Sequence, residues 1–338
     1  MRTSELRDAI ILIGQEGLTD SPLKKQRLKK KIHKASKLPG WKEAVLAGFK
    51  GTEGREWLWR IANARLTMGY HDWDGWGYRH PRAFKIPFKY DWWDVETKID
   101  RLLIMGEQGV GDEIMFGSLI KKVLPLAKEI TFECEPRLAN IFRGAYPQIE
   151  VVGRKDLNDA EWAKGRHFDG QVLLGDLPPT FCRDRESYSG KPYISIESDK
   201  RYEGRIGVSW KGRQGGFDPK RLPEQSLSLQ YGVKSHDFEV PAIDLTNDLD
   251  GVFRVIAACD RIISAPTSIV HFAGAMGVPV DLIMPPTGYK HGGFDEGQSN
   301  ALFWRWSEAY NGGNKSLWHD SVTIHRSLNE YLKYEKSR

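Results

Sequence analysis

Cysteines and long apolar runs are scarce in this chain of 338 residues, and each scarcity excludes a class of protein. The three cysteines, Cys134, Cys182 and Cys259, are far apart and form no CxxC pair, which excludes a disulfide framework and a structural zinc site. No stretch approaches the roughly 20 apolar residues of a membrane-spanning helix, and the apolar run at residues 9–13 is too short for a signal peptide. We therefore expect a cytoplasmic protein in a reducing compartment.

The small surplus of positive charge is confined to the N-terminus. The whole chain carries 50 Lys and Arg against 45 Asp and Glu, a net charge of +5. Residues 1–50 have a net charge of +7, so the rest of the chain has a charge of −2 and forms no basic nucleic-acid-binding surface. We interpret the basic segment 24–37 as a solvated helical face or arm. The alternative is contact with a protein partner or peripheral attachment to the inner membrane.

Apolar periodicity divides the chain into three parts. Residues 1–98 are basic and helical, and an apolar stripe predicts a helix over 54–70, followed by a second short helix. Strand and helix patterns then alternate, and they restart after a polar join near residues 190–204. This alternation predicts an α/β protein with two domains, residues 99–198 and 199–338, each a parallel sheet covered by helices, with the loops at the strand ends facing one cleft. The expected strands are 101–105, 129–135, 149–153, one within 168–178, 205–210, 226–232, 243–248, 261–264, 278–284 and 321–325; the expected helices are 112–127, 136–146, 249–260, 267–277 and one from Arg326.

The first candidate site is a glycine loop that follows a strand and opens a helix. Gly106, Gly109 and Gly111 have neither the GxGxxG spacing of dinucleotide-binding loops nor the Lys-Ser/Thr of a P-loop. They permit close approach of a ligand to the backbone and deliver Asp112 and Glu113 at the start of the helix. The alternative is that Asp112 is only an N-cap residue or a first-turn acid, which stabilises the start of that helix.

The second candidate site is the run APTSIVHFAGAMG, which follows a strand that ends at Ser264. Thr267 and Ser268 begin the next helix, where hydroxyls and free N–H groups make a phosphate site that needs no metal. His271 follows Thr267 by four residues and therefore lies one turn further on the same face. The alternative is simple capping by Thr267 or Ser268 and a packed His271.

The third candidate site is a glycine-rich loop after the strand at 205–210. It carries Lys211, Arg213, Lys220 and Arg221, and paired cations of this kind suit a pyrophosphate; a solvated basic loop is the alternative. The sequence has no HExxH or GxSxG motif and no convincing DxD pair at a strand end, so we expect no metal site.

At these motifs the sequence resembles a known family. LLIMGEQGVGDEIMFGSLI (102–120) is similar to the opening of the catalytic region in bacterial glycosyltransferases that follow tetratricopeptide repeats, relatives of the ADP-heptose lipopolysaccharide heptosyltransferases. MGYHDWDGWGYRHP (68–81) resembles the last helical repeat before such domains. The resemblance spans residues 55–326, and its further segments fit in order at 132–142, 207–213, 228–232, 256–280, 303–306 and 316–326.

The resemblance implies a GT-B fold of two Rossmann-like domains and an inverting, metal-independent transfer of a sugar from a nucleoside diphosphate sugar, without a cofactor, to a glycan or lipid-linked acceptor. Asp112 matches the proposed base, which takes the proton of the acceptor hydroxyl. The residues that match the donor-binding set are Lys220, Thr267, Ser268, His271, Tyr231 and Gly232.

Two departures from the family pattern favour a second hypothesis. Pro266 stands where the family has an acid before the threonine, and the stretch between Trp210 and Ser226 is short. The alternative function is therefore a catalytically silent module that binds a nucleotide sugar or acts as a scaffold. The repeat region is reduced to about one hairpin, so no extended superhelical acceptor groove is expected.

Overall fold

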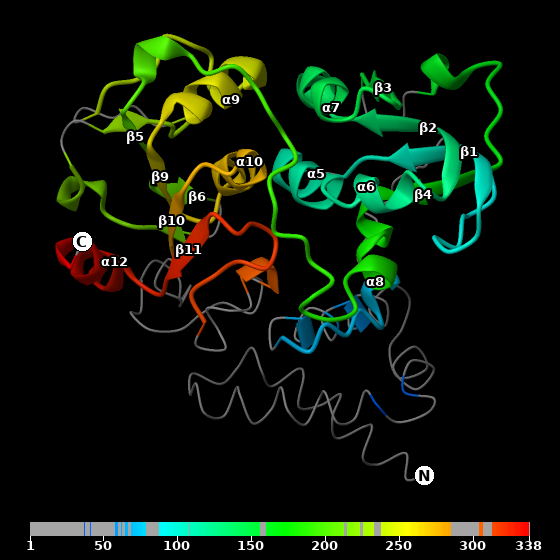
Figure 1. The fold of residues 1–338 in the computed structure, drawn as a ribbon, viewed down its shortest axis with the longest axis horizontal. Helices are drawn as coiled ribbons and strands as arrows, with labels where there is room; N and C mark the ends of the chain where they lie inside the picture. Colours follow the sequence, from blue (N-terminus) through cyan, green and yellow to red (C-terminus); the bar gives the residue numbers. More distant parts are fainter. Residues whose placement is uncertain are drawn as a thin grey trace.

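A computed structural model of the chain has two lobes, each built on a parallel β-sheet, which lie side by side (Figure 1). The lobes touch where helix α5 (Val110–Gly117) packs on helix α10 (Ser268–Met276), and a Cβ at Gly111 would lie 3.2 Å from the Cα of Ser268. The structure describes residues 37, 41, 58–59, 62, 65–66, 69–78, 88–107, 109–155, 160–212, 215–223, 226–232, 238–284, 304–306 and 313–337.

The first lobe holds a four-stranded sheet in the order β3-β2-β1-β4, and all paired strands are parallel. Residues 102–105 of β1 are fully buried, as expected for an apolar central strand in a sheet covered on both faces. The order reverses between β1 and β4, where the loops that leave the two strands diverge. The elements are β1 (Ile99–Met105), α5, α6 (Ile120–Val123), β2 (Ala127–Cys134), η2 (Pro136–Leu138), α7 (Ala139–Ala145), β3 (Glu150–Gly153), η3 (Glu161–Ala163), β4 (Gly170–Leu173), η4 (Leu174–Asp176) and α8 (Pro178–Phe181).

The second lobe holds a five-stranded parallel sheet in the order β11-β10-β9-β5-β8. If these five strands are numbered 1 to 5 in chain order, from β5 to β11, and read from the β8 edge, the sheet has the doubly wound order 2-1-3-4-5. The order reverses between β5 and β9. The elements are η5 (Lys200–Tyr202), β5 (Ile206–Ser209), β6 (Lys211–Gly212), β7 (Gly215–Gly216), η6 (Pro219–Arg221), β8 (Leu227–Ser228), α9 (Leu249–Ala258), β9 (Arg261–Ser264), α10, β10 (Val280–Ile283), η7 (Trp304–Trp306), β11 (Val322–His325) and α12 (Leu328–Lys336).

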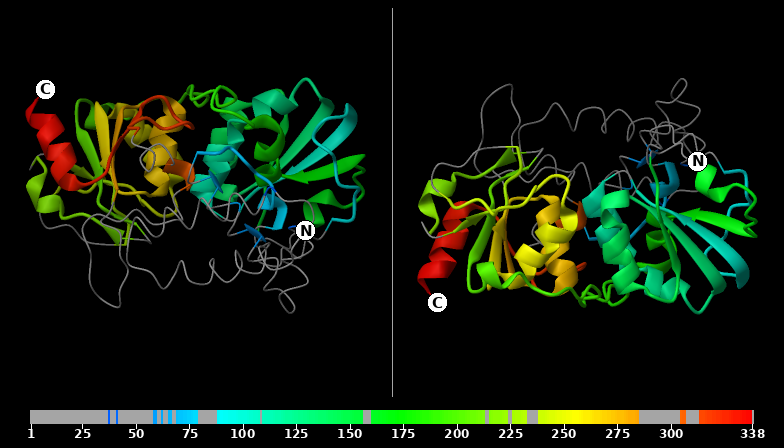
Figure 2. Two further views of the ribbon diagram at one scale, coloured as in Figure 1. Left: turned by 90° about the horizontal axis from the view of Figure 1, so that it is seen from below. Right: turned by 90° about the horizontal axis from the view of Figure 1, so that it is seen from above.

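One apolar core runs through both lobes. Helices α9 and α10 cover the sheet face that points toward the first lobe, while α12 covers the opposite face (Figures 1 and 2). Phe116 of α5 meets Trp318 edge to face with ring centroids 5.6 Å apart. The irregular segment that connects the lobes also packs on α10, because Tyr193 and Ile194 both donate main-chain hydrogen bonds to the carbonyl of Ala275. The junction is therefore packed where α5 meets α10.

The described N-terminal residues lie against the first lobe (Figure 1). Trp73 and Trp76 donate indole hydrogen bonds to the carbonyls of Cys182 and Gly175, at 2.7 and 2.8 Å. The stripe expected to face the core in the helix over 54–70, Trp57, Ile61, Ala64 and Met68, lies outside the described residues, as does the basic segment except Lys37. Of the helical residues that the structure describes in that region, four are buried: Leu58, Ala62, Arg65 and Leu66.

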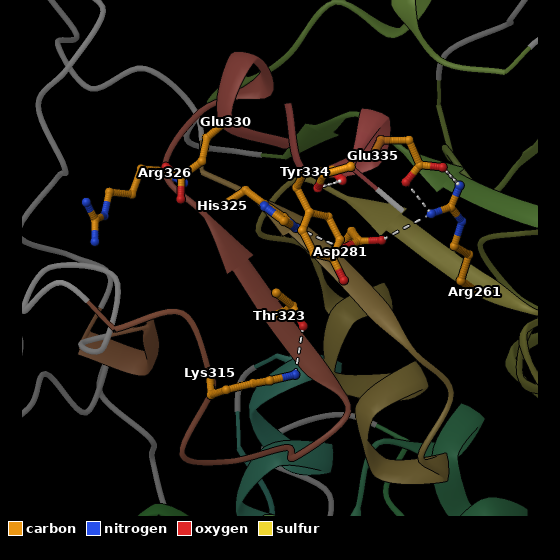
Figure 3. A network of polar contacts seen from close by, with 10 residues as sticks. Arg261, Asp281, Lys315, Thr323, His325, Arg326, Glu330, Tyr334 and Glu335 are labelled. Carbon is orange, nitrogen blue, oxygen red and sulfur yellow. Dashed lines mark hydrogen bonds and ion pairs between the residues drawn. The ribbon is translucent and has the colours of Figure 1, made fainter. Parts of the chain in front are cut away.

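A polar network fastens α12 to the second sheet (Figure 3). Arg261, at the start of β9, donates to both carboxylate oxygens of Glu335 at 2.7 and 2.5 Å. Asp281 lies 3.7 Å from Arg261 and 2.8 Å from Nε2 of His325. The closing helix therefore has a fixed register on β9, β10 and β11, and the predicted strand–helix end of the chain is confirmed.

Two expected elements are wrong. Residues 243–248, expected as a strand, form a turn because the Asp244 carboxylate accepts the main-chain N–H groups of Thr246 and Asn247 at 2.8 and 3.1 Å. The helix expected over 112–127 is split into α5 and α6 at Ser118, whose hydroxyl donates to the carbonyl of Met115. The other expected strands and helices of both lobes are confirmed within a few residues of the predicted bounds, although β8 has only two residues. Among the described residues, no helix is both long and apolar enough to cross a membrane.

Candidate active site

The glycine loop after β1 is shaped by its buried neighbours. A Cβ at Gly106 would lie 2.4 Å from Oε1 of Glu113 and 2.6 Å from Nη1 of Arg154, so a larger residue there would displace this buried ion pair. The loop is also tied to the end of β4, since the Glu107 carboxylate accepts the N–H of Gly175 at 2.8 Å. This loop thus stands at the order reversal of the first sheet, where ligands of open α/β sheets bind.

Asp112 lies in the first turn of α5 and reaches across the junction to the second lobe. Its Oδ1 accepts hydrogen bonds from Arg305 of η7, with Nε at 3.2 Å and Nη2 closer. About a third of each side chain stays exposed, 30% for Asp112 and 29% for Arg305. Gly109 holds the N-cap position and α5 has no side-chain cap, so Asp112 is not the capping residue, but the alternative of an acid in the first turn is confirmed.

Glu113, the other candidate acid, points the opposite way. Its side chain is fully buried in the first lobe, where it accepts hydrogen bonds from Arg154 at 2.8 Å and from the N–H of Glu135 at 2.9 Å. Burial outweighs these contacts and raises the pKa of the carboxyl to about 7. The structure therefore does not bring Glu113 together with Asp112, and these contacts fit a structural role.

Hydroxyl groups gather at the order reversal of the second sheet. Thr267 is the N-cap residue of α10, but its side chain makes no capping hydrogen bond. Its Oγ1 lies instead 3.1 Å from Oγ of Ser264 and 3.4 Å from Oγ of Ser209, which end β9 and β5. Ser268 follows and packs against Gly111 of the first lobe. The start of α10 thus presents hydroxyls beside the positive end of a helix dipole, directly opposite α5.

His271 lies one turn further along α10, and its neighbours include two residues that the sequence analysis missed. Its ring stacks on Trp306 with centroids 5.1 Å apart and planes 18° apart, and its Nδ1 lies 3.1 Å from Nε2 of His319. Burial lowers the pKa of His271 well below its usual value, helped by His319 and the charge of Arg305. Burial alone lowers the pKa of His319 to about 3, so both rings are neutral at pH 7.

The basic loop reaches the start of α10 at Gly212. A Cβ at Gly212 would lie 2.7 Å from the carbonyl oxygen of Pro266 and 3.3 Å from Thr267, so the end of β6 packs on the strand-to-helix loop. Lys211 is held there through its backbone, which exchanges hydrogen bonds with the Gln230 amide at 2.8 and 3.0 Å, and its side chain is exposed.

The remaining donor-binding candidates are dispersed. Lys220 lies exposed in η6, Tyr231 is 54% exposed, and Gly232 has the left-handed φ of +71°. No described contact joins any of these three to Thr267 or His271. Arg213 lies outside the described residues. The binding roles of these four residues stay predictions.

The structure therefore assembles five of the predicted residues, Gly111, Asp112, Thr267, Ser268 and His271, at one junction, and adds Arg305, Trp306 and His319. Arg305 and Trp306 come from FWRW and His319 from SLWHD, segments whose order in the chain matched the family but which have no periodicity that assigns a role. Within the described part of the chain, no group of three or more His, Cys, Asp or Glu side chains could hold a metal ion.

Comparisons with known proteins give distant likenesses. No protein-family model matches the sequence. The protein FlbA of Caulobacter vibrioides is 24% identical over 249 residues, which cover 59% of this chain and 42% of FlbA, so the chain spans less than half the length of this curated relative.

Three solved glycosyltransferase structures show a partial structural likeness. The dodecameric iron-containing glycosyltransferase TibC of enterotoxigenic E. coli has a TM-score of 0.46 at 11% identity and covers 71% of this chain and 77% of its own. The E. coli ADP-heptose lipopolysaccharide heptosyltransferase II has a TM-score of 0.39 at 14% identity, and the match covers 56% of this chain and 86% of the heptosyltransferase. The family 9 glycosyl transferase of Veillonella parvula has a TM-score of 0.40 at 10% identity, and the match covers 74% of this chain and 98% of the Veillonella protein. All three TM-scores lie below 0.5.

Proposed function

We propose that the chain is an inverting, metal-independent glycosyltransferase of GT-B type that moves a sugar from a nucleoside diphosphate sugar to a glycan or lipid-linked acceptor. One observation carries the proposal. The carboxylate of Asp112, at the start of α5, lies across a packed junction from the hydroxyl-bearing start of α10. A proton acceptor and an anion-binding helix end are the two groups that such a transfer requires on opposite sides of the anomeric carbon.

The reaction can be written with these groups. The acceptor oxygen forms a bond to the anomeric carbon from the side of α5, while the bond from that carbon to the β-phosphate oxygen breaks on the side of α10. Asp112 takes the proton of the acceptor hydroxyl. The nucleoside diphosphate leaves with the bonding electron pair, and its added charge is met by the N–H groups at the start of α10 and by the hydroxyls of Thr267 and Ser268. Attack opposite to the leaving group inverts the anomeric configuration.

The test of this proposal is the exchange of Asp112→Asn. Loss of a general base lowers turnover by about a hundredfold or more, while nucleotide affinity should stay within about threefold because the donor contacts lie on the other lobe. Asp100→Asn is a matched control, since Asp100 is an exposed aspartate at the opposite end of β1 and pairs only with Lys128 in the described contacts. Transfer is measured with ADP-, UDP-, GDP- and CDP-sugars. Equal turnover in wild type and Asp112→Asn would refute the role of Asp112.

A second candidate function, the catalytically silent nucleotide-sugar-binding or scaffold module, is favoured by one contact. Arg305 occupies the carboxylate of Asp112, the group that a transfer reaction would use as its base. Pro266 also replaces the acid that the family carries before Thr267. Calorimetry and transfer assays on the same donor panel separate the two functions. Nucleotide-sugar binding without turnover for glycan and lipid-linked acceptors would favour the silent module over the enzyme.

The proposed setting of this activity is the cytoplasm. The basic segment 24–37 would bring the protein to the inner membrane or to a protein partner, and Lys37, its one described residue, forms an ion pair with Asp72 at 2.6 Å. Removal of residues 1–36 should abolish sedimentation with vesicles that contain anionic lipid at low salt and leave nucleotide affinity unchanged. Sedimentation that is unchanged after removal would contradict the membrane contact.

A further inference from the structure

His319 is a buried imidazole whose position is fixed from three sides. Its main-chain N–H and that of Trp318 both donate to the hydroxyl of Ser316, at 3.3 and 3.1 Å, which defines the turn before β11. The ring lies on α10 at Gly274, where a Cβ would come within 2.4 Å of its Cγ. Only 1% of His319 is exposed. A neutral polar ring with this degree of burial needs a hydrogen-bond partner, and that partner is His271.

The two histidines share one hydrogen bond and therefore have linked tautomers. Nδ1 of His271 lies 3.1 Å from Nε2 of His319, and both rings are neutral at pH 7 because burial lowers both pKa values. A hydrogen bond between neutral imidazoles holds one proton. If His319 supplies it, then Nδ1 of His271 is an acceptor and Nε2 of His271 carries the other proton. If His271 supplies it, Nε2 of His271 carries no proton and presents a lone pair.

The free edge of His271 faces the junction. The Cδ2 atom, which is bonded to Nε2, lies 3.3 Å from the Cβ position at Gly111, next to the first turn of α5. His271 follows Thr267 by one helical turn, so this edge borders the start of α10. Trp306 covers one face of the ring, and Arg305 is the charged group close enough to affect its pKa. An N–H at this edge attracts an anion, whereas a lone pair repels it.

We propose that His319 is a positioning residue that donates its Nε2–H to His271 and thereby fixes His271 as the Nε2–H tautomer, a neutral hydrogen-bond donor to the diphosphate of the sugar nucleotide. This inference rests on the proposed function for the identity of the anion, but the tautomer is a property of the protein alone. The arrangement supplies a donor without adding a buried charge, which would cost free energy whenever the site is empty.

The tautomer is measured directly on the full chain labelled with ¹⁵N, from two-bond proton–nitrogen spectra at pH 7. His271→Gln and His319→Gln assign the signals. We expect the Nε2 atoms of both rings to be protonated and both Nδ1 atoms to be bare. A His271 that carries its proton on Nδ1 would overturn the inference, whatever ligand the protein binds.

A pair of substitutions at position 319 then tests the link to the ligand. The amide nitrogen of Gln reaches the place of the histidine Nε2, so His319→Gln should keep the affinity for ADP and UDP within about threefold of wild type. His319→Leu has similar volume but no donor, and it should weaken binding of those nucleotides by about tenfold or more, the usual effect of losing one hydrogen bond to a charged group. Thermal unfolding shows that each variant is folded, and calorimetry gives the dissociation constants.

Two kinds of result would overturn the inference: one concerns the positioning role of His319 and the other concerns the diphosphate ligand. Wild-type affinity in folded His319→Leu, or equal loss in folded His319→Gln and His319→Leu, would overturn the positioning role. A wild-type protein that binds none of ADP, UDP, GDP and CDP would overturn both the proposed function and the diphosphate part of this inference. The nitrogen spectra would still decide the tautomer in that case, so the two failures are distinguishable.

Discussion

The buried Glu113 carboxyl beneath the glycine loop makes a contribution to stability that falls as pH rises. One guanidinium, that of Arg154, is shared by two carboxylates, with Nη2 at 2.8 Å from Glu113 and Nε at 3.8 Å from Glu133. The Glu113 side chain has no exposed surface, and Nη1 of Arg154 makes no hydrogen bond with any described residue. Burial, together with the negative charge of Glu133, raises the pKa of Glu113 to about 7 from an ordinary value of 4.5.

The sign of the effect follows from proton linkage. Since the pKa of Glu113 is higher in the folded state, the folded protein binds the proton more tightly than the unfolded chain. The resulting stabilisation is fully present below the unfolded pKa of about 4.5 and is lost as the pH rises through 7. A pKa rise from 4.5 to about 7 corresponds to about 3 kcal/mol, at about 1.4 kcal/mol per pH unit.

The assay compares urea-unfolding free energies of wild type and Glu113→Gln between pH 5 and pH 8. The difference, wild type minus variant, should fall by about 2 to 3 kcal/mol over this range, because the variant has no proton to lose. His271 and His319, whose lowered pKa values act in the opposite direction, are present in both proteins and cancel. Glu150→Gln is the matched control, since the pKa of Glu150 is lowered by its hydrogen bond to Arg166 and it titrates below this window.

A difference between wild type and Glu113→Gln that is flat, or that grows with pH, would refute this account of the network. The same slope in Glu150→Gln and Glu113→Gln would also refute it, because the loss would then be a general property of removing a glutamate.

Three further predictions concern the junction and α10. Gly274→Ala should destabilise the protein by about 1 to 3 kcal/mol in urea unfolding, because its Cβ meets the His319 ring, and the sign should reverse in a His319→Ala background, where alanine gains helix propensity. Arg305→Gln should change stability by less than about 1 kcal/mol, since its ion pair with Asp112 is partly exposed, but steady-state transfer assays should show an altered pH–rate profile. Gly277→Ala should cost about 1 kcal/mol or more in thermal unfolding, because residue 277 has a φ of +80°.

The fold was largely predictable because several of its strands are short apolar runs with a glycine or serine at the end, such as RLLIM before Gly106 and RIIS, which ends at Ser264. Residues 101–105 and 261–264 could be assigned from their composition alone, and the polar join near 190–204 marked the passage between the lobes. Residues 243–248 were misassigned because IDLTND alternates apolar and polar residues as a strand does. Local hydrogen bonds to Asp244 outweigh that pattern, and single-residue capping of this kind is not visible in periodicity.

The site was predictable only where it lies at strand ends. Asp112 and Thr267 lie at helix starts that follow β1 and β9 after short loops, so topology alone brings them to the order reversals of the two sheets. Arg305 and His319 lie in stretches without periodicity, and their contacts depend on tertiary packing. Adjacency in sequence did not predict the position of Glu113. It adjoins Asp112, but successive residues of a helix point about 100° apart, and so it enters the core of the first lobe.

The packing between the lobes sets how these groups would act on a ligand. Phe116, one turn after Asp112 on α5, meets Trp318, which directly precedes His319. The same helix touches Ser268 through Gly111, with no side chain between the two backbones. The helix with the expected base, the helix that carries His271 and the turn that holds His319 therefore belong to one packed unit. Groups held in this way are already oriented before a charge develops, which is the condition under which fixed dipoles and hydrogen bonds stabilise a transition state most strongly.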